Sequence, residues 1–202
     1  MDDQPRAGAR AAPAADAQFS AGDARAALHA AECVHSAAAV QSALDAQAAA
    51  LTTAIGGDAP VLLAVMTGGL WPTVELSRRL EFAHRVDCVH ATRYEGARRG
   101  ATLRWRLAPR LALAGQCVVI VDDILDEGHT IAAVQSACRD AGAARVLTAV
   151  LVRKQHARLA PGVAVDFVAL EVPDRYVFGC GMDLHEYWRG LPAIYAVGDY
   201  GG

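Results

Sequence analysis

The stretch from Cys117 to Thr130 constrains the fold more than any other part of the chain. Its first five residues are all apolar, a run typical of a strand buried on both faces of a parallel sheet. Asp122 and Asp123 follow, where we expect such a strand to leave the sheet. A short turn containing Gly128 then leads into apolar residues at helical spacing, which end before another glycine. The stretch therefore predicts a strand, an acidic edge, a tight loop and a helix.

This arrangement suits a phosphorylated sugar. A loop that enters a helix N-terminus turns backbone N–H groups toward one point, where the helix dipole also favours an anion. Gly128 lets the backbone approach a phosphate closely, and Thr130 adds a hydroxyl donor. Asp122 and Asp123 would repel that phosphate, but they suit ribose hydroxyls or a hard cation such as Mg²⁺. The alternative is an ordinary strand–helix turn with a solvated acidic edge, which the density of these residue types disfavours.

Composition limits the class of protein. A chain of 202 residues fits one domain with a substantial core. The net charge of −3 and pI of about 6.1 favour neither a nucleic-acid nor a membrane partner. No secretory signal or long apolar span is visible in the sequence. The five cysteines form no C-x-x-C pair, as in reduced cytoplasmic proteins, and we expect a cytoplasmic location. They are Cys33, Cys88, Cys117, Cys138 and Cys180.

The N-terminal region contains much of the alanine. Residues 1–19 lack an apolar period and predict a mobile tail. Ser20 and Asp23 have the spacing of a capping box, which predicts a short helix there. A brief extended piece is expected near residues 33–35, and a second helix from Ser36 to about Ile55.

Further apolar runs alternate with helical patterns and predict an α/β protein with a parallel sheet. Strands are expected over residues 61–66, 86–91, 102–107, 145–152 and 166–170. After the first of these, Thr67 and Gly68 begin a second loop whose N–H groups could face an anion. The helix beyond that loop has Pro72 in its first turn. We expect it to bury Val74, Leu76 and Leu80.

A basic, glycine-bounded segment covers residues 92–100 and includes Tyr94, Arg98 and Arg99. Its arginines could simply form a solvated surface. Alternatively, the segment could be a lid that closes over an anionic substrate.

These motifs resemble those of a known family. The stretch up to Thr130 is similar to the phosphoribosyl-diphosphate signature: an apolar strand, two acids, two apolar residues, Asp, a variable residue, Gly, a variable residue and Thr. Lys154, the segment 173–177, Asp183 and Arg189 resemble the 6-oxopurine branch. Over about residues 61–197 the chain therefore resembles a purine phosphoribosyltransferase of the hypoxanthine-guanine type found in bacteria.

The resemblance implies an α/β, type I phosphoribosyltransferase fold: a twisted, mainly parallel sheet flanked by helices, with a small hood from the N- and C-terminal segments. On this basis, residues 20–202 are expected to form one domain. Its core would cover about residues 58–172, and its hood about residues 20–36 and 173–202. Ligands are expected at the carboxyl edge of the strands.

The resemblance also implies a role for individual residues. Phosphoribosyl and phosphate contacts would come from Asp122, Asp123, Asp126, Glu127, Gly128, His129 and Thr130. Pyrophosphate contacts would come from Thr67, Gly68 and Arg189, and purine contacts from Lys154, Tyr176 and the backbone of Val177. Asp183 would hold Mg²⁺, and Asp122 and Asp123 would contact a metal or the ribose. Asp126 would be the general base, and residues 94–100 the lid.

Three positions depart from the common family pattern. Asp122 stands where Glu is frequent, and the two are chemically equivalent. Thr67 replaces a basic residue of many relatives, which leaves the backbone amides to hold pyrophosphate. His129 stands where Lys or Asn is frequent, and could be a phosphate donor or only a loop residue.

The implied reaction joins ribose 5-phosphate from 5-phosphoribosyl diphosphate to hypoxanthine or guanine, giving IMP or GMP and pyrophosphate. Lys154 disfavours adenine, because an ammonium group cannot accept a hydrogen bond from an amino group. Two alternatives stay open: a xanthine-preferring enzyme, and a regulator that senses phosphoribosyl diphosphate. The resemblance further implies a homodimer or homotetramer.

Overall fold

The computed structural model describes residues 19–93 and 103–198. The expected tail therefore lies outside the described residues, except for Phe19. The same is true of the expected lid residues Tyr94, Arg98 and Arg99.

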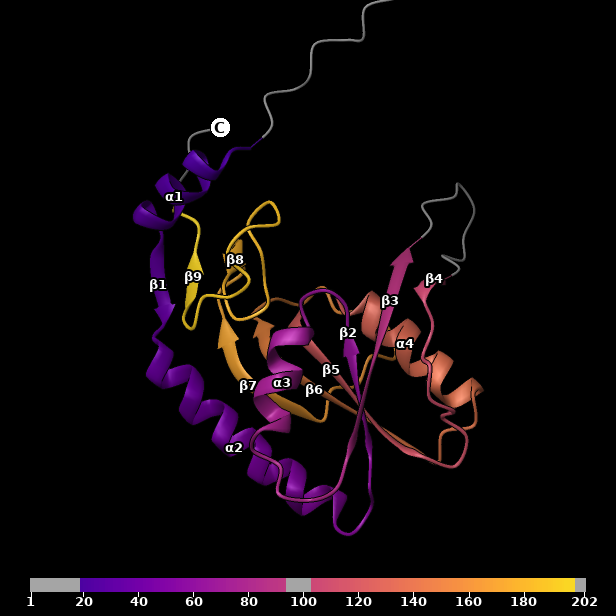
Figure 1. Cartoon of the computed structure of the whole chain (residues 1–202). Helices are drawn as coiled ribbons and strands as arrows, with labels where there is room; N and C mark the ends of the chain where they lie inside the picture. The colour runs from indigo at the N-terminus through magenta and orange to yellow at the C-terminus, as the bar shows by residue number, and fades with distance from the viewer. Residues whose placement is uncertain (1–18, 94–102, 199–202) are drawn as a thin grey trace, which may run out of the picture.

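A six-stranded sheet forms the centre of the molecule (Figure 1). Its strands lie in the order β4-β3-β2-β5-β6-β7, and all pairs are parallel except β3 with β4. The strands are β2 (Val61–Val65), β3 (Arg85–Arg93), β4 (Leu103–Leu107), β5 (Cys117–Leu125), β6 (Arg145–Lys154) and β7 (Phe167–Val172). The predicted α/β class with a mainly parallel sheet is confirmed.

Strand β5 is central and longer than predicted. Residues 117–121 are buried, as the apolar run requires. However, the strand continues through Asp122 and Asp123 to Leu125, so the expectation that the acids follow the strand was wrong. The reason is that the two neighbours of β5 end at different levels. Its pairing with β2 ends at Val121, whereas its pairing with β6 continues to Leu125. Asp122 and Asp123 thus lie in the part of β5 that extends beyond its pairing with β2.

Helices cover both faces of the sheet. Helices α2 (Ala37–Ile55) and α3 (Leu70–Ser77) pack on one face, and α4 (His129–Asp140) packs on the other (Figure 1). In α3, Leu76 is fully buried and Leu80 just beyond the helix is also buried. Val74 is 57% exposed, so its predicted burial was wrong. The short helix contacts the sheet along one narrow face, and Val74 lies outside it.

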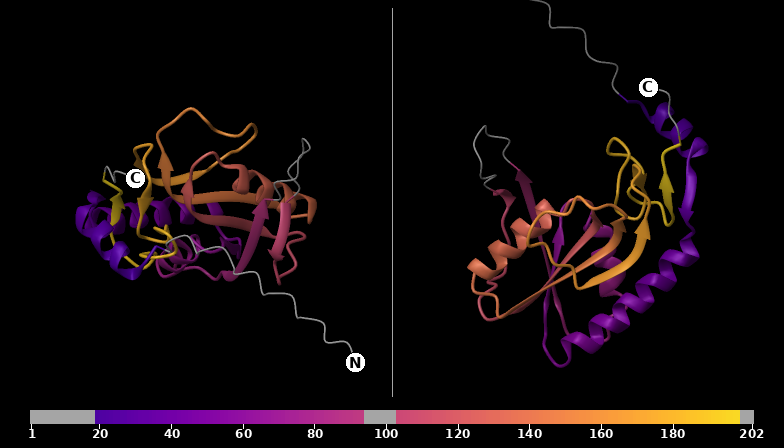
Figure 2. Two further views of the ribbon diagram at one scale, coloured as in Figure 1. Left: turned by 90° about the horizontal axis from the view of Figure 1, so that it is seen from above. Right: turned by 180° about the vertical axis from the view of Figure 1, so that it is seen from behind.

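A second, three-stranded sheet brings the two ends of the described chain together. Strands β1 (Glu32–His35), β9 (Ile194–Ala196) and β8 (Val177–Phe178) pair in that order, all antiparallel. Helix α1 (Ala21–Ala30) begins at the predicted capping box of Ser20 and Asp23. Figures 1 and 2 show this layer standing above the carboxyl edge of the large sheet, beside the ends of β5 and β6. The precise division into core and hood stays a prediction.

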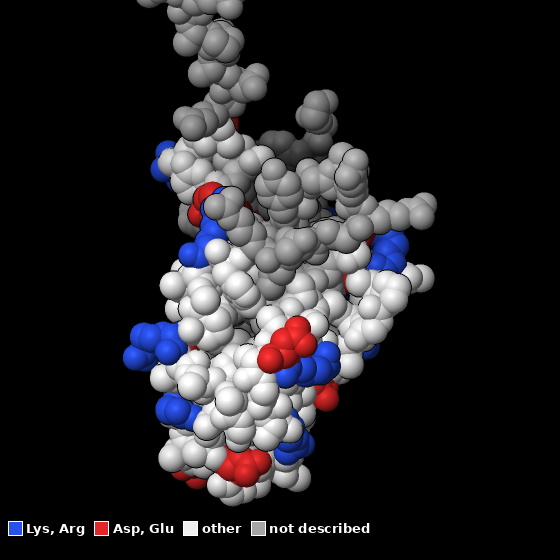
Figure 3. Space-filling view, turned by 90° about the vertical axis from the view of Figure 1, so that its right-hand side faces the viewer, with Lys and Arg blue, Asp and Glu red and all other residues white. Residues whose placement is uncertain are grey.

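Charged side chains are dispersed over the face seen in Figure 3. Lys and Arg appear singly or next to Asp and Glu, and most of the described surface in this view is uncharged.

Among the helices that the structure describes, none combines the length and apolar character needed to cross a membrane.

Candidate active site

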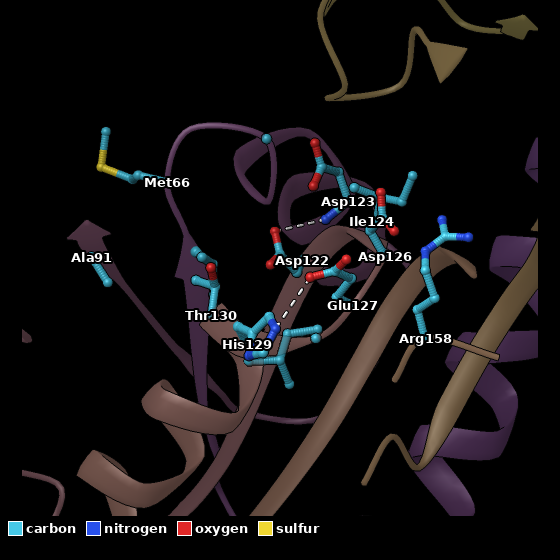
Figure 4. A pocket seen from close by; sticks show the side chains of 14 residues that line it. Met66, Ala91, Asp122, Asp123, Ile124, Asp126, Glu127, His129, Thr130 and Arg158 are labelled. Atoms are coloured by element: carbon cyan, nitrogen blue, oxygen red, sulfur yellow. Dashed lines mark hydrogen bonds and ion pairs between the residues drawn. The ribbon is translucent and has the colours of Figure 1, made fainter. Parts of the chain in front are cut away.

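The loop between β5 and α4 lines a cleft of about 520 Å³ (Figure 4). Gly128 is the N-cap of α4 and has a left-handed backbone, with φ of 79°. No side chain caps this helix, so the first-turn N–H groups are left to face an anion. A Cβ on Gly128 would lie 3.0 Å from atoms of Leu125 and Val163. The left-handed backbone therefore favours glycine here, and a larger residue would also push the side chains of Leu125 and Val163 aside.

The predicted phosphoribosyl residues converge on this cleft. Its lining includes Asp122, Asp123, Asp126, Glu127, Gly128, His129 and Thr130. His129 forms an ion pair with Glu127 at 3.2 Å, drawn as a dashed line in Figure 4. Sequence reasoning missed Arg158, which stands across the cleft from Met66 and Ala91 (Figure 4).

Asp122 and Asp123 are buried carboxylates, 8% and 9% exposed. Burial raises the pKa of both, and the negative charge of Asp123 raises the pKa of Asp122 further. Asp122 accepts a hydrogen bond from the backbone N–H of Asp123 at 3.0 Å. Two acids held this close in a buried position are unfavourable unless hydroxyl donors or a cation meet them.

Gly68 and Gly181 enclose Asp123 from two different loops. A Cβ on Gly68 would lie 1.7 Å from Oδ2 of Asp123, and a Cβ on Gly181 would lie 2.3 Å from the carbonyl oxygen of Gly68. The loop after β2, the acid on β5 and the loop after β8 thus touch at one point. Gly68 lines the cleft, whereas the side chain of Thr67 is exposed, and the Met66–Thr67 peptide bond is cis.

Asp126 is held by two donors. Lys154 Nζ lies 2.7 Å from its Oδ2, and His156 Nε2 lies 2.8 Å from its Oδ1. Burial acts to raise the pKa of Asp126, but the hydrogen bonds from Lys154 and His156 outweigh it and lower that pKa. Sequence reasoning missed His156, since it belongs to no motif. Its place two residues beyond Lys154, just after a parallel strand, was the available signal.

A smaller cavity of about 170 Å³ adjoins the cleft. All the predicted purine contacts lie here, together with the predicted magnesium ligand of the hood. Its lining comprises Asp123, Ile124, Asp126, Lys154, Tyr176, Val177, Met182 and Asp183. Asp123 and Asp126 line both spaces, so a ligand that filled both would pass these two carboxylates.

Arg189 is paired with acids of its own loop. Its Nη2 lies 2.7 Å from Oδ1 of Asp183 and 2.9 Å from Oε2 of Glu186, and Nη1 donates to the carbonyl oxygen of Gly181 at 3.0 Å. The predicted pyrophosphate and metal ligands thus neutralise each other. In the part of the chain that the structure describes, no three His, Cys, Asp or Glu side chains form a metal cluster.

Comparison with known proteins identifies the family of this chain. Residues 31–186 match the family model described as phosphoribosyl transferase domain. A protein of Tritrichomonas foetus named hypoxanthine-guanine-xanthine phosphoribosyltransferase is 27% identical, over 77% of this chain and 85% of its own. Hypoxanthine phosphoribosyltransferase of Escherichia coli K12 is 28% identical, over 68% of this chain and 78% of its own.

A solved structure shows the same architecture. The crystal structure of a hypoxanthine phosphoribosyltransferase from Staphylococcus aureus superimposes with a TM-score of 0.77 at 21% identity, and covers 83% of this chain and 91% of its own. This likeness confirms the predicted type I phosphoribosyltransferase fold. The relatives likewise confirm the resemblance to the hypoxanthine-guanine type. Because the family model spans more than half of the sequence, the chain belongs to the phosphoribosyl transferase domain family.

Proposed function

We propose that this protein transfers ribose 5-phosphate from 5-phosphoribosyl diphosphate to N9 of hypoxanthine or guanine. The products would be IMP or GMP and pyrophosphate, a reaction of purine salvage. The observation that supports this most is the junction of two cavities at Asp123 and Asp126. One cavity has the features of a phosphate and ribose site, and the other is lined by Lys154 and Tyr176.

The phosphoribosyl group fits the larger cleft. Its 5′-phosphate would accept hydrogen bonds from the N–H groups at the start of α4 and from Thr130. The ribose hydroxyls would donate to Asp122 and Asp123. The carboxylate oxygens of this pair also suit Mg²⁺, which is usually bound by one or two carboxylates together with substrate oxygens. When bound, Mg²⁺ would supply positive charge beside the departing pyrophosphate.

The purine fits the smaller cavity. Lys154 would leave Asp126 and donate to the 6-oxo group, and Tyr176 would stack on the ring. The backbone of Val177 would contact the exocyclic edge. Since Lys154 lowers the pKa of Asp126, its departure raises that pKa and makes the carboxylate a better proton acceptor. Binding of a 6-oxopurine would thereby activate the base that accepts the purine proton.

Pyrophosphate would leave toward the loop after β2. Among the residues that the structure describes, the backbone N–H of Gly68 and the guanidinium of Arg189 are proposed to stabilise its charge. For this, Arg189 would break its ion pair with Asp183 and bind the pyrophosphate instead. Asp183 would then be free to bind a cation. The role of residues 94–100 as a lid stays a prediction.

The proposal also includes the oligomeric state and the cellular location of the protein. A homodimer or homotetramer is proposed from the family resemblance alone. The five cysteines are free thiols in the structure, and this supports a cytoplasmic location, where thiols are kept reduced.

A panel of bases with 5-phosphoribosyl diphosphate and Mg²⁺ tests the function. We expect turnover of hypoxanthine and guanine and little turnover of adenine. Xanthine is the second candidate, because the relative from Tritrichomonas foetus is named for it as well. Turnover of adenine as fast as hypoxanthine would contradict the proposed role of Lys154. Binding of 5-phosphoribosyl diphosphate without turnover of any base would favour the sensing regulator.

A further inference from the structure

His156 is a buried imidazole with both ring nitrogens engaged. Its side chain is 4% exposed. Nε2 lies 2.8 Å from Oδ1 of Asp126, and Nδ1 accepts the backbone N–H of Arg158 at 3.0 Å. Because Nδ1 accepts, the single proton of the neutral ring lies on Nε2, which donates to Asp126.

The segment that presents His156 is anchored at several points. Gln155 N–H donates to the carbonyl oxygen of Val172 at 2.9 Å, and Ala160 N–H donates to that of Glu127 at 2.7 Å. The guanidinium of Arg158 makes two hydrogen bonds to Asp174, at 2.8 and 2.9 Å. The imidazole therefore reaches Asp126 from a fixed support.

The two donors on Asp126 differ in what substrate binding does to them. Lys154 approaches Oδ2 on a long flexible side chain and is the group that would turn to the purine. His156 contacts the other oxygen, Oδ1, from the anchored segment, and this contact would persist when the purine binds. We propose that His156 is a positioning residue that keeps Asp126 aimed at the purine while Lys154 releases Oδ2.

This role rests on the proposed function, because it assumes that Asp126 accepts the purine proton. The residue that would orient the Asp126 carboxylate, His156, lies outside the family motifs. A purely structural histidine would instead stabilise the turn after β6 and leave the chemical step unchanged.

Two substitutions separate these roles. His156→Phe keeps the aromatic bulk but removes the donor, whereas His156→Gln keeps an N–H near the position of Nε2. We expect His156→Phe to lower the single-turnover rate of IMP synthesis about 10- to 100-fold, as small misplacements of reacting groups do. His156→Gln should restore most of this loss. The KM for 5-phosphoribosyl diphosphate and the affinity for IMP should change little in both.

His84→Phe is the matched control. His84 also has both ring nitrogens engaged, with Ser77 and the carbonyl oxygen of Phe82 at 2.8 Å each, but it contacts no site residue there. Its single-turnover rate should equal that of the wild type. Equal rates in His156→Phe and the wild type would overturn the proposal, and so would failure of His156→Gln to exceed His156→Phe.

The tautomer gives a second readout that does not depend on folding of a variant. Nitrogen NMR of the wild type should show a proton of His156 on Nε2, and a ring without a proton on Nε2 would overturn the proposal. Failure of the proposed function looks different: the wild type itself would convert no base, and this role would fall with it. A fast His156→Phe variant would overturn this role alone.

Discussion

Lys154 and Asp126 form an ion pair of 2.7 Å, although one is the proposed purine ligand and the other the proposed base. Each side chain is therefore occupied by the other, and under the proposed function a bound purine would separate them. An amino group at C6 cannot accept a hydrogen bond from the ammonium. Adenine consequently offers no acceptor at C6 that would draw Lys154 away from Asp126. Under the proposed function, the ion pair would link recognition of the purine to removal of the purine proton.

Lys154→Met should weaken use of hypoxanthine. A hydrogen bond from a charged group contributes about 1.5–3 kcal/mol, which corresponds to a loss in kcat/KM of about 10- to 150-fold. The KM for 5-phosphoribosyl diphosphate should stay within about threefold, because Lys154 lies in the smaller cavity. Steady-state kinetics with each substrate varied in turn measures both. Arg153→Met is the control, since Arg153 is the preceding residue and pairs with Glu171 instead. An equal loss in both variants would contradict the assignment of Lys154.

Asp126→Asn should separate binding from chemistry. Asn keeps the shape of the side chain but cannot accept a proton at neutral pH. General-base contributions are about 10²- to 10⁴-fold, and we expect a loss in this range in the single-turnover rate of IMP synthesis. The affinity for IMP, measured by calorimetry, should change little. An unchanged single-turnover rate would show that Asp126 only shapes the loop and that another group accepts the proton.

Gly68→Ala should impair catalysis through Asp123. The added Cβ would overlap Oδ2 of Asp123, so the carboxylate or the loop must move. Because displacements of about 1 Å can cost about 10²-fold, we expect a loss of at least about tenfold in kcat/KM for 5-phosphoribosyl diphosphate. Gly57→Ala is the control, because a Cβ there meets nothing within 4 Å. Wild-type kinetics for Gly68→Ala would mean that Asp123 tolerates displacement and does not position the substrate.

The helices and strands of this fold could be predicted from local patterns. The side chains that hydrogen-bond to the predicted site residues could not. Strand β5 is recognised from its apolar run, and helix α4 from the glycines around it. Both signals involve residues that are close together in the sequence. The exact end of β5 depends on how far β6 pairs with it, which no local pattern contains. His156 reaches Asp126 across 30 positions of sequence. Such contacts follow from strand order, and a family motif reveals them only where the family shares them.

Asp122 is expected to reduce the stability of the ligand-free protein. Burial and the charge of Asp123 raise its pKa in the folded state, so its carboxyl ionises more easily when the chain is unfolded. The destabilisation is absent below the unfolded pKa of about 3.9. It grows as the pH rises between the unfolded and folded pKa values and is complete above the folded one. Asn carries no charge and avoids this cost at every pH.

Asp122→Asn should therefore melt at a higher temperature than the wild type at pH 8 in the absence of ligands and Mg²⁺, and the difference should shrink toward pH 4. For a chain of this length, each 1 kcal/mol of relief corresponds to about 2–4 °C in Tm. Scanning calorimetry at both pH values measures the shift. Asp58→Asn is the control, because Asp58 is exposed. Activity should fall in Asp122→Asn, since the ribose or cation loses a charged partner. A Tm equal to or below that of the wild type at pH 8 would show that the buried pair does not destabilise the fold, and the reason to expect a cation or hydroxyls beside it would be lost.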